Sequence, residues 1–176
     1  VGENGLKELE TVCWVLDICN AKVNDSCGFH VHMDAAGFNL DTWKNLTLTY
    51  KHLEHLIDAF MPRTRRNNTY CKTLSGVSDE RIKSVRTIDG LREVFNNDRY
   101  HKVNFEAYSR HRTVEFRQHS GTTNFTKMEN WIRFLNGLIT FAKRSSLPSR
   151  MTLEELPFLD GKQKLFFKLR TKKLAV

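Results

Sequence analysis

The segment Gly-Phe-His-Val-His-Met-Asp at residues 28–34 places His30, His32 and Asp34 on alternate positions. Alternate side chains of a β-strand point to the same face, so these three polar groups would stand together, about 7 Å apart along the strand. The phenylalanine, valine and methionine between them form an apolar row that would anchor the strand on a core. A row of imidazole and carboxylate groups is hard to bury without ligands, and it predicts a binding face.

A second segment, residues 113–119, supplies the groups that the first one lacks. Its polar side chains Thr113, Glu115, Arg117 and His119 alternate with valine, phenylalanine and glutamine, which predicts that they share one face of a strand. A guanidinium group binds phosphate or carboxylate, and a carboxylate binds a hard divalent cation. Glu-x-Arg alone could equally be a surface ion pair worth at most about 1 kcal/mol. Combined with His-x-His, it indicates a site for a metal ion and a phosphorylated ligand.

Two other functions are compatible with these residues. His-x-His can hold one zinc ion through both imidazoles, and the segment resembles the His-x-His-x-Asp-His motif of metallo-β-lactamase-type zinc hydrolases. However, Ala35 occupies the position of the last histidine of that motif. The other alternative is that the chain is a non-catalytic interaction or structural module.

The hydrophobic pattern indicates the elements that position these groups. Apolar residues recur at helical spacing in four regions, and polar and apolar residues alternate in three. The pattern predicts a hairpin loop at residues 109–112 between the last two strands. We expect helices at residues 4–19, 41–60, 78–95 and 126–144, and strands at residues 28–34, 102–108 and 113–119.

The chain has 176 residues and a formal net charge of +8. We expect one α+β domain at residues 1–150 and a basic amphipathic tail at residues 151–176 that packs on the domain or on a partner. The basic clusters are not interleaved with aromatic residues as in a nucleic-acid module, so we do not expect nucleic acid to be the main partner. No apolar run is long enough to span a membrane, and the first residues lack the order of a signal peptide, which favours a cytoplasmic protein.

The motifs resemble those of the amidoligase family, carboxylate-amine ligases of the glutamine synthetase superfamily that phages and bacteria often encode. Residues 24–32 are similar to an Asn-x-Ser-x-Gly-x-His-x-His signature, and residues 113–122 to the later Glu-x-Arg strand. Arg99-Tyr100, with Asn104 four residues further on, adds to the resemblance. The resemblance implies a curved antiparallel sheet with helices packed on its outer face, as in the catalytic domain of glutamine synthetase.

The resemblance also implies cofactors and roles. ATP and Mg²⁺ or Mn²⁺ would be bound, with His30 and Glu115 as metal ligands and His32 on the nucleotide phosphates. Arg117 would bind the phosphoryl or acyl-phosphate group, and Arg99 would be a further catalytic contact to phosphate or substrate. In the implied reaction ATP phosphorylates a carboxylate, and an amine then displaces the phosphate. The two substrates would be small molecules or peptides whose identity the sequence does not indicate.

The sequence departs from the family pattern in two places. The family normally opens with a Glu-x-Glu strand that holds another metal ion, whereas Glu8-Leu9-Glu10 lies in a helical pattern and is better explained as a solvated helix face. We therefore expect a missing N-terminal segment or a partner chain to supply that strand, unless the ligase activity has been lost and a binding role remains. A homo-oligomer is a further possible assembly of this chain. Thr113 stands where the superfamily has an arginine, and we assign the adjacent Arg112 to the cofactor site.

Overall fold

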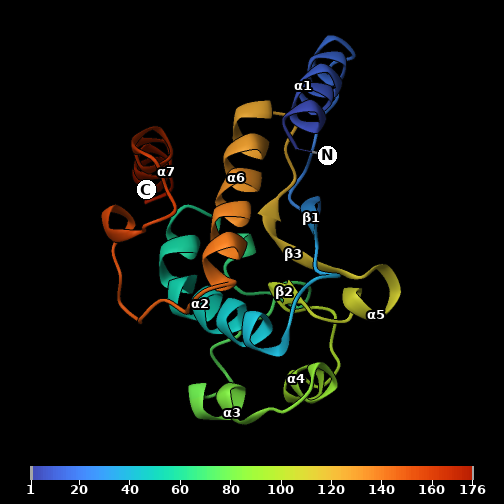
Figure 1. The fold of residues 1–176 in the computed structure, drawn as a ribbon. Coiled ribbons are helices and arrows are strands. Elements are labelled where there is room, and N and C mark those ends of the chain that lie inside the picture. Colours follow the sequence, from blue (N-terminus) through green and yellow to red (C-terminus); the bar gives the residue numbers. More distant parts are fainter. Residues whose placement is uncertain (1, 176) are drawn as a thin grey trace.

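The computed structural model describes residues 2–175 and consists of helices packed around a small antiparallel sheet (Figure 1). This mixture confirms the α+β class. Two 3₁₀ turns, η1 (Arg63–Arg65) and η2 (Leu153–Glu155), lie between the longer elements. The order is α1 (Gly2–Ile18), β1 (Gly28–Asp34), α2 (Leu40–Ala59), α3 (Asp79–Ser84), α4 (Ile88–Val94), β2 (Val103–Asn104), α5 (Ala107–His111), β3 (Thr113–Ser120), α6 (Phe125–Ala142) and α7 (Gly161–Leu174).

The sheet has the order β1-β3-β2, and β3 pairs antiparallel with both neighbours. In this register His32 on β1 lies opposite Glu115 on β3, and Asn104 on β2 lies opposite the same glutamate. The central strand therefore brings residues from all three strands to one point of the sheet.

The pairing of β1 with β3 contains a β-bulge. Phe29 pairs with His119 and Val31 pairs with Phe116, so His30 alone lies opposite two residues of β3, Arg117 and Gln118. A bulge adds one residue to a strand and breaks its alternation between the two faces.

The prediction that His119 shares a face with Glu115 is wrong because of this bulge. His119 is buried, and its ring lies 5.8 Å from the rings of both Phe29 and Trp131. It belongs to the core and not to the polar face.

The buried position of His119 predicts a specific pH dependence of stability. Burial, with repulsion from nearby Arg170, Lys127 and Arg65, lowers the pKa of its imidazole from 6.5 to about 4. Below pH 6.5 the unfolded chain therefore binds a proton that the folded chain does not. We expect His119 to reduce the free energy of unfolding by about 2–3 kcal/mol between pH 7 and about pH 4.5. Urea denaturation of the wild type and of His119→Phe at both pH values would measure this, and equal losses in the two proteins would contradict it.

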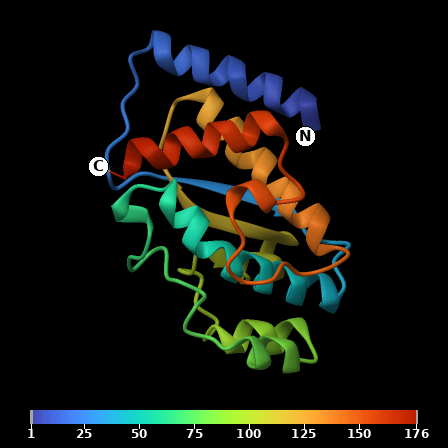
Figure 2. The ribbon, with the colours of Figure 1, turned by 90° about the vertical axis from the view of Figure 1, so that its left-hand side faces the viewer.

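Helices α2 and α6 cover one face of the sheet. Figure 2 views the molecule from this side, with α7, α6 and α2 in front of the strands. Tyr50 of α2 packs on Phe116 of β3, and Trp131 of α6 packs on Phe60 and Phe134. The opposite face of the sheet carries the polar side chains of β1 and β3.

The C-terminal segment packs on the same helical layer. Phe167 of α7 is buried, and its ring lies 4.4 Å from that of Phe60 and 5.4 Å from that of Phe134. At the other end of the chain, Glu8 and Glu10 are exposed on α1, which confirms that Glu8-Leu9-Glu10 is a solvated helix face. Within residues 2–175, none of the helices combines the length and apolar character needed to cross a membrane.

Three predicted elements differ from the structure. The strand expected at residues 102–108 ends after Asn104, because the Asn104 side-chain oxygen accepts a hydrogen bond from the Glu106 backbone N–H (2.9 Å) and turns the chain. The expected hairpin loop at residues 109–112 is instead the end of α5, which Arg112 terminates in a left-handed conformation (φ 56°). The helix expected at residues 78–95 is divided into α3 and α4, because the Thr87 hydroxyl caps a new helix.

Candidate functional site

The carboxylate of Glu115 is the centre of the polar face. Its side chain is only 7% exposed, and three groups lie within hydrogen-bond distance of it: Nδ1 of His30 (3.0 Å), Nη1 of Arg117 (2.7 Å) and Nδ2 of Asn104 (2.5 Å). Nε2 of His32 lies 3.8 Å away. The structure therefore brings together the two imidazoles of β1 with the carboxylate and the guanidinium of β3.

These partners keep Glu115 ionised. Burial alone would raise the pKa of this carboxyl group, but hydrogen bonds from His30 and Asn104 and the charge of Arg117 lower it to about 2. The carboxylate is thus a fixed negative charge at physiological pH. It can orient the two imidazoles and the guanidinium, and it can serve as a ligand to a cation.

The strand pattern explains why the two histidines remain accessible. Val31 is buried and Phe29 and Met33 are half-buried on the helical side of β1, whereas the side chains of His30 and His32 are 34% and 42% exposed on the other side. Core packing of the apolar row fixes the strand, so the imidazoles are held without being buried.

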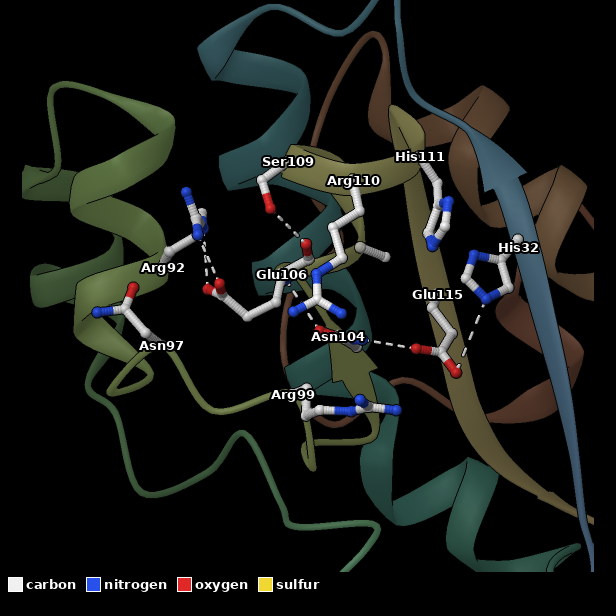
Figure 3. Close-up of a pocket in the computed structure, with 11 residues that line it drawn as sticks. His32, Arg92, Asn97, Arg99, Asn104, Glu106, Ser109, Arg110, His111 and Glu115 are labelled. Carbon is white, nitrogen blue, oxygen red and sulfur yellow. Dashed lines mark hydrogen bonds and ion pairs between the residues drawn. The ribbon is translucent and has the colours of Figure 1, made fainter.

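A pocket of about 430 Å³ opens beside Glu115 (Figure 3). Strands β1, β2 and β3 form one wall of it, and α4, α5 and the loop between α4 and β2 form the other. Its lining is almost entirely polar and comprises His32, Arg92, Asn97, Arg99, Asn104, Glu106, Ala107, Ser109, Arg110, His111 and Glu115.

The charges of this pocket are unbalanced. Arg92 is neutralised by Glu106, with nitrogen–oxygen distances of 2.5 and 2.8 Å. In contrast, Arg99 and Arg110 are exposed and form no ion pair with the carboxylates of residues 2–175, and Figure 3 shows both side chains directed into the pocket. The pocket therefore suits an anionic ligand.

The remaining predicted site residues lie elsewhere. Arg112 does not line this pocket, and its guanidinium lies over the ring of Tyr108 at 4.1 Å. The Asp34 carboxylate accepts a hydrogen bond from the backbone N–H of Ala36 (3.1 Å) and so stabilises the turn after β1.

Sequence reasoning missed several pocket residues. Arg110 and His111 fall in the segment expected to be a hairpin loop, and its helical conformation places both side chains in the pocket. The ring of His111 lies 5.8 Å from that of His32. No periodicity indicates this contact. Asn104 did carry a signal, because it belongs to the family resemblance, but its hydrogen bond to Glu115 was not foreseen.

The arrangement of the donor side chains restricts which metal ion the site could hold. In residues 2–175 no group of three or more His, Cys, Asp or Glu side chains is arranged to hold a cation. Structural and catalytic zinc sites use at least three protein ligands, so the described residues do not fit the zinc-hydrolase alternative. Mg²⁺ is commonly bound by one or two carboxylates together with substrate phosphates. Glu115, with His30 beside it, fits this way of binding Mg²⁺.

Comparison with known proteins gives one match. A family model described as putative amidoligase enzyme matches residues 2–139. No curated protein and no solved structure gives a significant match to the chain. The matched region includes every residue of the Glu115 cluster and of the pocket, and it ends within α6, before α7.

Proposed function

The chain belongs to the amidoligase family. We therefore propose that it contributes to ATP- and Mg²⁺-dependent formation of an amide bond between a carboxylate and an amine. In the proposed reaction a carboxylate oxygen attacks the γ-phosphorus of ATP, which gives an acyl phosphate and releases ADP. The amine nitrogen then attacks the acyl carbon, loses a proton and displaces inorganic phosphate. The sheet would be the core of a glutamine synthetase-type catalytic domain.

One observation carries this proposal: His30, His32 and Arg117 converge on a buried, ionised carboxylate beside a basic pocket. Cationic and hydrogen-bonding groups of this kind position phosphates and offset the charge that grows during phosphoryl transfer. We assign Arg117 to the transferring phosphoryl group and His32 to a nucleotide phosphate.

Glu115 and His30 would hold the Mg²⁺ ion, with the remaining ligands coming from ATP. When bound, the ion supplies charge neutralisation at the phosphates. Asn104 and Arg117 keep the Glu115 carboxylate ionised and oriented before the cation arrives.

We assign the pocket to the carboxylate substrate. Among residues 2–175, the only apolar side chain that lines it is Ala107 and the only rings are imidazoles, so it does not suit an adenine base. Arg99 and Arg110, which form no ion pair within the described part of the chain, suit a carboxylate, which arginine can bind through two parallel hydrogen bonds.

Acyl-phosphate trapping tests the proposed function. Purified protein would be incubated with Mg²⁺, ATP, hydroxylamine and a panel of carboxylic acids. We expect a hydroxamate and an equal amount of ADP with at least one acid. Failure to bind Mg²⁺–ATP in calorimetry would contradict the proposal. Binding of ATP without hydroxamate or phosphate release across the panel would instead favour a non-catalytic binding module.

Substitution of Arg110 tests whether the pocket binds the carboxylate substrate or ATP. Arg110→Gln removes one charge-assisted contact, so we expect KM for the carboxylate to rise about tenfold or more while KM for ATP changes less than about twofold. Arg86→Gln is the matched control, because Arg86 is exposed and lies outside the pocket. A larger effect on ATP than on the carboxylate would show that the pocket holds the nucleotide instead.

A further inference from the structure

Arg65 is a buried arginine beneath the β-bulge of β3. Arg65 is the last residue of the 3₁₀ turn η1, which begins directly after Pro62, and it is only 5% exposed. Its Nε donates a hydrogen bond to the carbonyl oxygen of Gln118 (3.2 Å), and its Nη2 donates to the carbonyl oxygen of Arg117. Arg117 and Gln118 are the two bulge residues that lie opposite His30.

This contact has an unusual electrostatic setting. Arg65 forms no ion pair with the carboxylates of residues 2–175, and within these residues its buried guanidinium donates hydrogen bonds to backbone carbonyls. Burial of a charge is costly unless specific partners compensate it. The carbonyls of a bulge are suitable partners because the bulge disrupts the regular ladder of hydrogen bonds.

The backbone of Arg117 is held on both sides at the start of the bulge. The backbone N–H of Arg117 donates to the carbonyl oxygen of Lys102 (2.9 Å), while the Arg117 carbonyl is held by Arg65. Both sides of this residue are therefore fixed, and its side chain is aimed at Glu115 at 2.7 Å.

Arg65 also borders the histidine side of the site. A Cβ atom added to Gly28 would lie 2.7 Å from Nε2 of His30 and 3.2 Å from Nη2 of Arg65. The imidazole and the buried guanidinium thus share the space that the missing side chain of Gly28 leaves free.

We propose that Arg65 is a positioning residue, which holds the bulge carbonyls so that Arg117 faces the Glu115 site. This inference rests on the proposed function, because it assumes that Arg117 binds a phosphoryl group. Arg65 itself acts through the backbone of Arg117 and not on the substrate.

A double-mutant cycle tests this role. Mg²⁺–ATP affinity and kcat would be measured for the wild type, Arg65→Met, Arg117→Met and the double variant. We expect Arg65→Met to lower affinity or kcat roughly 10–100-fold, as loss of an outer-sphere partner typically does. If Arg65 acts through Arg117, the double variant should be no worse than Arg117→Met alone. Arg65→Lys should recover part of the loss, since an ammonium group can still donate to the carbonyls.

Arg63→Met is the matched control, because Arg63 lies exposed on the same 3₁₀ turn. Additive losses in the cycle, or an unchanged Arg65→Met, would overturn the inference while leaving the proposed function intact. An unchanged Arg117→Met would contradict the proposed phosphate role of Arg117 and the inference with it. If Arg65→Met does not fold, the cycle would use Arg65→Lys, whose loss should likewise disappear in the Arg117→Met background.

Discussion

Replacement of Glu115 by glutamine is expected to weaken Mg²⁺–ATP binding at least about 100-fold. Glu115 receives charge-assisted contacts from His30 and Arg117, each worth roughly 1.5–3 kcal/mol, and 1.4 kcal/mol corresponds to a tenfold change in affinity. Glutamine keeps the shape of the side chain but loses its charge, so its amide oxygen holds these groups and the cation much less strongly. Calorimetric titration of Mg²⁺–ATP would measure the change.

Two further variants make the Glu115 experiment decisive. Glu129→Gln is the control, because Glu129 also pairs with an arginine, Arg133 at 3.0 Å, but lies on α6 away from the pocket. Glu115→Asp retains the charge and should keep part of the affinity, which distinguishes loss of the site from loss of folding. Circular dichroism would verify that each variant is folded. If folded Glu115→Gln binds Mg²⁺–ATP within about threefold of the wild type, the proposed site is wrong.

The second large effect is expected in stability. Lys102 is 1% exposed, and its Nζ lies 2.8 Å from Oδ1 of Asp58 and 3.8 Å from Oε1 of Glu54. Lys102→Met would leave these two carboxylates on α2 without their buried cation. Removal of one partner of a buried ion pair costs about 3–5 kcal/mol, so we expect a loss of that size in the free energy of unfolding, measured with urea.

An exposed ion pair provides the comparison for Lys102. Lys72 lies 2.6 Å from Asp98, but its side chain is 45% exposed. Because water screens such a pair, Lys72→Met should cost no more than about 1 kcal/mol. Similar losses in the two variants would show that burial of Lys102 does not govern its contribution.

The elements with strong periodicity were predictable. Residues 28–34 form β1 with the bounds that their alternation indicates, and α1, α2 and α6 agree with the apolar spacing to within about two residues. The same alternation gives each strand one polar face, and it predicted that His30, His32, Glu115 and Arg117 lie together on that side of the sheet. The catalytic and cofactor roles of these residues stay predictions.

The features that were missed depend on contacts between side chains and backbone. The Asn104 side chain ends β2, and Arg65 holds the bulge that turns His119 into the core. Neither contact leaves a periodic pattern in the sequence. The same reason explains why Arg110 was not recognised, because it reaches the pocket only through the helical turn of α5.

The pocket is lined by residues from two kinds of element. His32 and Glu115 lie on paired strands, whereas Arg99 and Arg110 lie on a separate stretch of turns and a five-residue helix. In the proposed function, the groups assigned to phosphate and the groups assigned to the carboxylate substrate therefore lie on different elements and can change independently. Under the proposed function, a chimaera that exchanges only residues 96–101 and 105–111 between members of the family is expected to transfer substrate preference and to retain phosphoryl transfer by the host, because Lys102 and strand β2 stay in place.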